Sequence, residues 1–563
     1  MAVPSYDVLV LGAGLAGQRA ALAAARAGAS VAVVSKVHPV RSHSVAAAGG
    51  INAAVDDDDS WEQHAGDTVK GSDYLADQDA VEVLCREAPG EVRSLERQGV
   101  AFHRNADGRL DTRPFGAASH DRTCYVADIT GQAILHVLYE QLLKLDAPVD
   151  RYEEWFVTTL LTGDDGAVVG CVARDVRTGR LEQFRAKSVI LATGGAGQSY
   201  RPTTNAVICT GDGIALAYRV GAHLMDMEMI QYHPTTLAVV GILITEGARG
   251  EGAHLYNANG ERFMERYAPN KMELASRDVV ARAEQTEINE GRGFPDGTVA
   301  LDITKVPRKR TLEALREIVN IGRDFAGVDI TREPIHIRPG CHYIMGGVKT
   351  DVWGETSIPG LYAAGEVACV SCHGANRLGG NSLLDTLIFG RRSGERAAQR
   401  AAEVDLPPAA DAAVQDQQRR IDAIGAREQK GPKVFELKEQ LGRTMHQHVG
   451  VFREAAGLAR AGDVIAQLRE RAAGAWIDDR GKLFNQDIPA AIELEQMLDV
   501  AACTVAAASA RTESRGSHHR TDFTTRDDER WMHHLTVSAG PDGPVLSEAP
   551  VTVTRWQPEE RTY

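Results

Sequence analysis

The chain has 563 residues, which is enough for roughly three to five domains of ordinary size. Its 62 Lys and Arg residues are outnumbered by 77 Asp and Glu residues, so the net charge is −15, which argues against nucleic acid and against direct adhesion to anionic lipid. No apolar run reaches the length of a membrane span, and the first apolar run leads into a glycine pattern rather than a cleavage site. We therefore expect an intracellular protein that meets a membrane only through partners.

The N-terminal segment carries a dinucleotide-binding pattern. Residues 6–11 and 31–35 read as parallel strands around a helix over 18–27. Between the first strand and the helix lies Gly12-Ala13-Gly14-Leu15-Ala16-Gly17, which predicts a phosphate-binding turn. An acidic residue usually ends the second strand, but Ser35 and Lys36 stand there instead.

Two later segments also read as strands that end in glycine. Residues 187–193 lead into Gly194, and residues 360–364 lead into Gly365-Glu366. Such strands typically end at a bound dinucleotide, where Glu366 and Asp212 could supply acidic contacts. The stretch 235–345 between them must be an insertion. Within it we expect a hairpin at Asn259-Gly260 and a helix that starts near Ser276.

After residue 394 the composition shifts to Ala, Glu, Gln and Arg. Pro407-Pro408 marks a break, and helical periodicity runs from Phe435 to Leu458. This pattern predicts a helical domain to about residue 510, followed by a small mixed tail. The acidic run 56–59 reads as a solvated loop, because carboxylates at consecutive positions point in different directions.

The eight cysteines are scattered, which is typical of reduced thiols. Cys369-Val370-Ser371-Cys372-His373 has the C-x-x-C-H spacing of haem attachment, but that chemistry needs export and the chain shows no export signal. No second cysteine or histidine pair has zinc-ligand spacing. We therefore expect no metal site.

Three motifs together point to a known family. His43 lies in Arg41-Ser42-His43-Ser44, just before Gly49-Gly50-Ile51, and alone it would read as a surface histidine. Residues 373–383 read His-Gly-Ala-Asn-Arg-Leu-Gly-Gly-Asn-Ser-Leu, and residues 338–343 read Arg-Pro-Gly-Cys-His-Tyr. With these motifs and the tail segment 513–518, the chain resembles the flavoprotein subunit of succinate dehydrogenase and fumarate reductase over nearly its whole length.

The resemblance implies an α/β fold. A Rossmann-like FAD-binding domain would carry an inserted α+β capping domain and be followed by a helical domain and a small C-terminal domain. We place the FAD-binding domain at residues 1–234 and 346–400, the capping domain at 235–345, the helical domain at 401–510 and the C-terminal domain at 511–563.

The resemblance also implies FAD bound covalently to His43, which makes a flavin more oxidising, as the desaturation of succinate requires. The implied cofactor contacts are Gly12, Ala13, Gly14, Gly17, Ser35, Lys36, His43, Ser44, Gly49, Gly50, Thr193, Gly194, Asp212, Glu366, Arg377, Ser382 and Leu383.

The implied substrate-binding residues are His233, Thr245, His342 and Arg377, and arginine suits a carboxylate because it offers two parallel donors. The resemblance makes Arg277 the acid/base, with Glu246 and Arg249 passing the proton to solvent. Ser276 reads as an N-cap, which would place Arg277 at the positive end of a helix. The alternative is that these arginines only neutralise the charge of the substrate.

The implied partners are an iron–sulfur subunit and, beyond it, membrane anchor subunits with a quinone site, which would hold the chain at the cytoplasmic face of the cell membrane. The physiological direction, succinate oxidation or fumarate reduction, stays open. L-aspartate oxidase is the rival enzyme, and His43 argues against it. A non-catalytic flavin-binding subunit is the rival of another class, but it would have lost residues such as Arg377, His342 and Arg277.

Overall fold

The largest sheet positions the glycine turn. The computed structural model describes residues 3–147, 149–238, 240–409 and 411–561. The sheet has the strand order β6-β2-β1-β9-β8-β7, and β16 pairs with the end of β9. Strands β6, β2, β1, β9 and β16 run parallel, whereas β7, β8 and β9 pair antiparallel. The bounds are β1 Ser5–Leu11, β2 Val31–Ser35, β6 Asp150–Glu153, β7 Trp155–Thr162, β8 Val168–Asp175, β9 Leu181–Leu191 and β16 Leu361–Ala363. The predicted strands 6–11 and 31–35 are confirmed.

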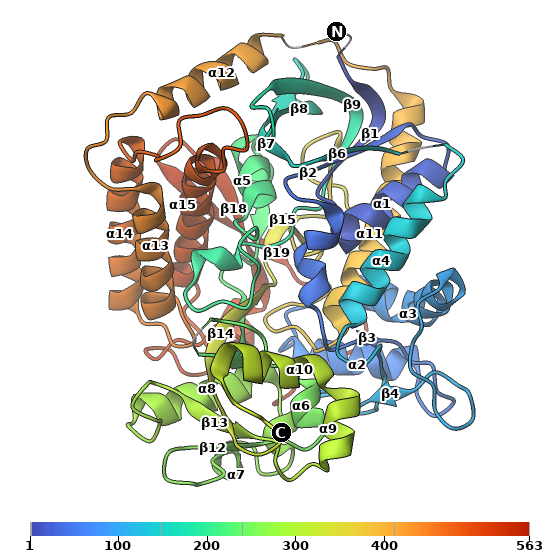
Figure 1. The fold of residues 1–563 in the computed structure, drawn as a ribbon, viewed down its shortest axis with the longest axis vertical. Helices are drawn as coiled ribbons and strands as arrows, with labels where there is room; N and C mark the ends of the chain where they lie inside the picture. The colour runs from blue at the N-terminus through green and yellow to red at the C-terminus, as the bar shows by residue number, and fades with distance from the viewer. Residues whose placement is uncertain (1–2, 148, 239, 410, 562–563) are drawn as a thin grey trace.

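Both faces of this sheet are buried, as in doubly wound α/β folds. Along β1, Val8 and Val10 face one core, and Leu9 and Leu11 face the other. The first core contains side chains from α1 Leu15–Arg26, α3 Gln78–Gln98, α4 Thr130–Leu143 and α11 Asn381–Glu403. The second contains side chains from α5 Asp212–Arg219 and from the helices of the C-terminal half (Figure 1).

Short elements fill the segment between β2 and α4. They are the helical turns η1 Pro39–Arg41 and η2 His43–Ala46, the helix α2 Trp61–Gly71, and a small sheet of β3 Ile51–Asn52, β5 Thr123–Cys124 and β4 Thr112–Arg113. The acidic run is a loop, as predicted, but only Asp57 and Asp58 are exposed. Asp59 is buried against Arg122, with Nε to Oδ2 at 2.8 Å.

The capping region has its own sheet and its own core, at the bottom of Figure 1. The strand order is β11-β14-β13-β12. The bounds are β11 Ile230–Leu237, β12 His254–Tyr256, β13 Val299–Asp302, β14 Ile335–Ile344, α6 Gly247–Gly250, α7 Met264–Tyr267, η4 Met272–Leu274, α8 Arg277–Asn289, α9 Arg308–Ala314, α10 Arg316–Ile321 and η5 Gly322–Ala326. The helix expected near Ser276 is α8.

The hairpin expected at Asn259-Gly260 is wrong, although the turn is present. Gly260 has a φ of +76°, and the side chain of Asn257 accepts hydrogen bonds from the backbone N–H groups of Asn259 and Glu261, both at 3.0 Å. However, β12 pairs with β13, which lies about forty residues later in the chain. The local turn signal identified a turn but not the strand pairing, which is decided by packing over a longer range.

The C-terminal half begins with a helical group, orange to red in Figure 1. It consists of α12 Asp411–Gly425, α13 Val434–His448, α14 Ala455–Ala473 and α15 Asp487–Ala510. The helical periodicity from Phe435 to Leu458 spans two helices, because α13 ends at His448 and α14 begins at Ala455. Val449 and Val451 stay buried in the connection and carry the apolar pattern across it. The end of the helical region at residue 510 agrees with the prediction.

The tail completes a second sheet rather than standing apart. This sheet has the order β17-β15-β10-β18-β19. The bounds are β10 Leu224–Met225, β15 Gly347–Lys349, β17 Ala368–Cys369, β18 His533–Gly540 and β19 Gly543–Pro550, with α16 Asp528–Trp531 just before the hairpin and η3 Gly197–Ser199 elsewhere in the chain. The tail hairpin of β18 and β19 therefore pairs with β10, which precedes the insertion. The same sheet contains β15 and β17, which follow the insertion.

Candidate functional site

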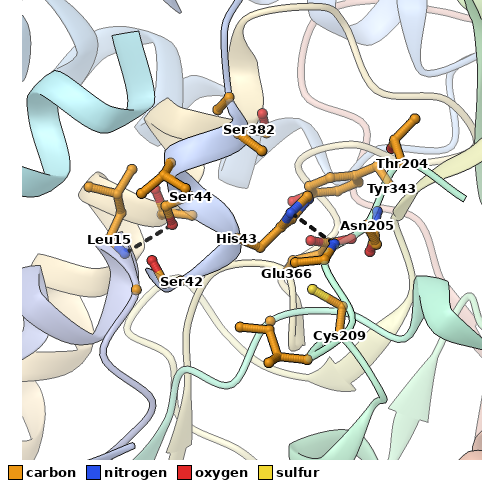
Figure 2. A pocket seen from close by; sticks show the side chains of 18 of the residues that line it. Leu15, Ser42, His43, Ser44, Thr204, Asn205, Cys209, Tyr343, Glu366 and Ser382 are labelled. Atoms are coloured by element: carbon orange, nitrogen blue, oxygen red, sulfur yellow. Dashed lines mark hydrogen bonds between the residues drawn. The ribbon is translucent and has the colours of Figure 1, made fainter. Parts of the chain in front are cut away.

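One cavity of about 590 Å³ lies at the carboxyl ends of β1, β9 and β16 and extends under the capping region. Figure 2 shows His43, Glu366 and Tyr343 grouped on one side of it. The predicted site residues that line it are Gly12, Ala13, Gly14, Ser35, Lys36, His43, Ser44, Gly49, Gly50, Thr193, Gly194, Asp212, His233, Thr245, Glu246, Arg277, His342, Glu366, Arg377, Ser382 and Leu383. Gly17 and Arg249 are outside this lining.

The glycine turn brings the backbone against one end of the cavity. Gly12 has a φ of +109°, and a Cβ there would lie 2.2 Å from the carbonyl oxygen of Ala192. A Cβ on Gly17 would lie 1.9 Å from the carbonyl oxygen of Gly12, so Gly17 serves close packing rather than ligand contact. Helix α1 begins directly after Gly14, and its free N–H groups favour a phosphate.

His43 starts η2 and lines the cavity. Its Nδ1 accepts a hydrogen bond from the backbone N–H of Ala206 at 3.3 Å, which Figure 2 marks. Burial lowers the pKa of His43 to about 4. The imidazole is therefore neutral at neutral pH, with Nε2 outside this hydrogen bond. Beside it, the hydroxyl of Ser44 accepts from the N–H of Leu15 at 3.3 Å.

Lys36 is held by a buried ionic cluster. Its Nζ lies 2.6 Å from Asp212 and 2.9 Å from Glu493 on α15. Both carboxylates raise the pKa of Lys36 above its usual range against the opposite effect of burial. Lys36 still lines the cavity, but its charge is neutralised by protein groups, and this pairing ties the strand end at Ser35 to the helical region.

Glu366 sits at the end of the strand segment 361–363, as predicted. Its Oε1 accepts from the N–H of Ile344 at 3.1 Å, and burial raises its pKa to about 7. Nearby, the hydroxyl of Thr193 is buried with no hydrogen-bond partner in the described ranges, and Thr193 too lines the cavity. A polar group of this kind is expected to meet a ligand.

The predicted substrate-binding residues lie close together although they belong to separate segments of the chain. The rings of His233 and His342 lie 4.9 Å apart. Nδ1 of His233 accepts from the N–H of Thr235 at 3.2 Å, so Nε2 carries the proton; Nε2 is buried and has no partner among the described residues. His342 Nδ1 lies 2.7 Å from the hydroxyl of Thr204. Burial, and after it the charge of Arg277, holds the pKa of both histidines well below its ordinary value. Thr245 is buried beside them on the cavity wall.

Arg377 is buried over the ring of Tyr343, with the guanidinium carbon 4.5 Å from the ring centroid. No carboxylate is hydrogen-bonded to it among the described residues, and its Nε has no partner. Burial and the neighbouring Arg277 lower its pKa to about 9. A buried cation without a counter-ion favours an anionic ligand.

Arg277 and Glu246 form a buried ion pair inside the cavity. Arg277 donates from Nε to Glu246 Oε2 at 2.7 Å, and its Nη2 lies 2.6 Å from the same oxygen. Arg249 Nη2 lies 3.9 Å from that oxygen on the far side. Burial alone would raise the pKa of Glu246, but Arg277 and Arg249 outweigh it and hold the pKa below its usual value. The three predicted catalytic residues thus form one chain.

Ser276 occupies the N-cap position of α8, as expected, but its side chain does not cap the helix. Its hydroxyl donates to Asp278 instead. Arg277 therefore lies at the helix start, where the dipole disfavours a cation, while Glu246 stabilises the cation directly.

Gln231 is a site residue that the sequence reasoning missed. Its Oε1 accepts from Arg277 at 3.1 Å, and its Nε2 donates to the carbonyl of Arg377 at 2.7 Å and to Asn376 Oδ1 at 2.9 Å. It therefore fixes the two arginines relative to each other. The signal was its place two residues before His233. Gly116, whose N–H donates to Glu246 Oε1 at 2.7 Å, was also missed.

The C-x-x-C-H segment makes internal contacts. All eight cysteines are buried and free. Among the described residues, Cys372, His373 and Asp385 offer donor atoms within 4.8 Å of one another. Tyr343 lies within hydrogen-bond distance of both His373 and Asp385, at 3.3 and 3.1 Å, and burial raises the pKa of the Cys372 thiol well above its ordinary value. Tyr343 is thus a protein partner for His373 and Asp385, and burial disfavours the ionised form of Cys372.

Across the described ranges, no helix has both the length and the apolar character that crossing a membrane requires.

Comparison with known proteins gives full-length matches. Residues 7–383 match the family described as "FAD binding domain", and residues 438–563 match "Fumarate reductase flavoprotein C-term". A fumarate reductase flavoprotein subunit of Mycobacterium tuberculosis is 45% identical, with 99% of both chains covered. A succinate dehydrogenase flavoprotein subunit of Rickettsia conorii is also 45% identical, over 98% of this chain and 96% of its own. A FrdA variant of E. coli quinol fumarate reductase superposes with a TM-score of 0.95 at 39% identity, over 100% of this chain and 99% of that chain.

Proposed function

The chain belongs to the family of succinate dehydrogenase and fumarate reductase flavoprotein subunits, and we propose that it interconverts succinate and fumarate with bound FAD. One observation carries this proposal. Arg377, a buried cation with no carboxylate partner among the described residues, lies in the same cavity as His43 and the Arg277–Glu246 ion pair. The site therefore combines an anion-binding group, a proton-carrying pair and a place for the cofactor.

The residues fit FAD. The glycine turn, the start of α1 and the unpartnered hydroxyl of Thr193 supply backbone and side-chain donors along the cavity wall. When bound, FAD supplies the two-electron acceptor that succinate oxidation requires. We expect the cofactor contacts named above to act there, with Gly17 acting through packing and Lys36 through its cluster with Asp212.

We further propose that His43 holds FAD covalently. Its imidazole is neutral, and Nδ1 accepts from the N–H of Ala206, so Nε2 carries the proton and would lose it on bonding to the cofactor. A ring alkylated at Nε2 retains its lone pair at Nδ1, so this hydrogen bond suits the attached form. L-aspartate oxidase, which resembles this family but holds FAD without a bond, is disfavoured by this arrangement.

The substrate residues provide donors for two carboxylates. Arg377 offers a planar pair of N–H groups, and His233 offers the proton on Nε2. Arg277 would then exchange a proton with a carbon of the substrate, and Glu246 and Arg249 would pass that proton on. Because Gln231 holds Arg277 and the Arg377 backbone together, the proton carrier and the carboxylate clamp keep a fixed separation.

Other subunits are also proposed. Reduced cofactor must be reoxidised, so we propose an iron–sulfur subunit docked on this chain and membrane anchors with a quinone site beyond it, at the cytoplasmic face of the cell membrane. Among solved relatives, one is described as Mycobacterium smegmatis Sdh1 in complex with UQ1. We also keep the domain boundaries after residues 234, 345, 400 and 510 as proposals.

The test is an assay of the purified FAD-loaded protein in both directions. We expect succinate oxidation with an artificial electron acceptor and fumarate reduction with a reduced dye. Absence of both reactions in protein that carries FAD would refute the proposal. In the assembled complex, rates with a low-potential and a high-potential quinone would then show which direction it favours.

A further inference from the structure

The chain of Arg277, Glu246 and Arg249 ends inside the protein and does not reach solvent. Arg249 is fully buried and does not line the cavity. Its Nη1 donates to the carbonyl of Glu273 at 2.5 Å, but its Nε and Nη2 have no hydrogen-bond partner within the described part of the chain. A proton that reaches Arg249 from Glu246 therefore needs one more acceptor before it meets solvent.

Glu284 offers such an acceptor. It lies on α8 and is 0% exposed, and neither of its carboxyl oxygens has a hydrogen-bond partner among the residues that the structure describes. A buried, unpartnered carboxyl group is rare in folded proteins because it costs free energy, and so calls for a functional explanation. Arg249 is the charged group that acts on it electrostatically. Arg249 thus has unused donors and Glu284 has unused acceptors, although no hydrogen bond joins the two among the described residues.

The position of Glu284 along α8 leads away from the site. It follows Arg277 by seven residues, which is about two helical turns and places both on the same face of the helix. One turn further, Glu287 is bound by Arg266 and Arg292, whose side chains are 47% and 26% exposed. The face of α8 therefore runs from the catalytic arginine to an ionic cluster at the surface.

We propose that Glu284 is the proton carrier beyond Arg249 and connects the Arg277–Glu246–Arg249 chain to solvent beside the Glu287 cluster. In succinate oxidation, Arg249 passes one proton toward Glu284, and Glu284 releases one proton outward. In fumarate reduction the same transfers run in reverse, and no group in the chain is oxidised or reduced. Burial raises the pKa of Glu284 well above its ordinary value while Arg249 opposes this, so its surroundings favour the protonated form more than solvent does. This inference rests on the proposed function.

The test is Glu284→Gln in the FAD-loaded protein, which keeps the shape but removes the exchangeable acid. Glu333→Gln, at an exposed position of the capping region with no ion pair among the described residues, is the matched control. We expect kcat to fall by about 10²-fold, the lower end for loss of an acid/base group, with KM and FAD content unchanged. The solvent deuterium isotope effect on kcat should increase, and Glu284→Asp should restore part of the rate. A merely structural role would move Tm or FAD content instead.

A kcat and an isotope effect equal to wild type in Glu284→Gln would overturn the proposal. If that variant does not fold, Glu284→Asp decides, because its longer proton transfer should lower kcat and enlarge the isotope effect, and wild-type values of both would equally overturn the proposal. Wild-type protein that turns over neither substrate would refute the proposed function itself, so the two failures are distinguishable.

Discussion

Arg277 and Glu246 meet at 2.6 Å within a cavity whose wall also contains His43 and Arg377. The pair comes from the start of α8 and from the residue before α6, and both side chains are buried. This relationship joins proton transfer to substrate binding in one space. It also makes the contributions of single residues separable by mutation.

Glu246→Gln should be slow although it keeps the size of the side chain. The variant loses the negative charge that pairs with Arg277. It also loses the carboxylate that can accept a proton between Arg277 and Arg249. We expect kcat to fall by about 10²–10⁴-fold with a smaller change in KM. Steady-state fumarate reduction measures both. Glu261→Gln, which is exposed in the capping region, is the control, and a rate close to that control would argue against Glu246 as a relay.

Arg277→Lys and Arg377→Ala should separate chemistry from binding. Arg277→Lys should still bind a dicarboxylate inhibitor, seen as a perturbed flavin spectrum, while turnover collapses. Arg377→Ala should lose binding first, because a carboxylate would be left without its partner, so kcat/KM should fall with it. Near wild-type turnover of Arg277→Lys would contradict the arginine shuttle and favour His233 or His342 as the proton carrier.

His43→Ser should keep FAD without a covalent bond. The denatured wild-type chain should carry the FAD mass on the peptide that contains His43, and the variant should release FAD on acid precipitation. The variant should keep some fumarate reduction but lose most succinate oxidation, because the flavin becomes less oxidising. An unmodified His43 peptide from fully matured wild-type protein would contradict covalent attachment.

The affinity for a dicarboxylate should not fall near neutral pH through deprotonation of His233 or His342. Burial and Arg277 hold the pKa of His233 and His342 well below the ordinary value of about 6.5. Raising the pH through about 6–8 therefore removes no positive charge from either ring. Glu366 lines the same cavity with a pKa of about 7, so the titration is made in a Glu366→Gln background. There the inhibitor affinity should show no inflection near 6.5, whereas a loss of affinity would mean that the rings are charged in the free site.

How far the sequence predicts this site depends on whether the chemistry is local. The glycine turn follows from Gly12 and Gly17 alone, since a side chain at either would collide with nearby backbone. By contrast, Glu493 pairs with Lys36 from 457 residues away, and Gln231 reaches Arg277 across 46 residues. Neither has a neighbouring motif that names its partner. Likewise, the apolar pattern of 435–458 does not reveal the end of α13, because Val449 and Val451 stay buried in the turn.

The central claim is tested most directly by substrate choice in the purified FAD-loaded protein. Succinate and L-aspartate are offered in parallel with the same electron acceptor, and Arg277→Lys serves as the matched inactive control. We predict oxidation of succinate to fumarate that the control lacks, with little turnover of L-aspartate. Oxidation of L-aspartate in preference to succinate, or equal rates in the control, would contradict the account.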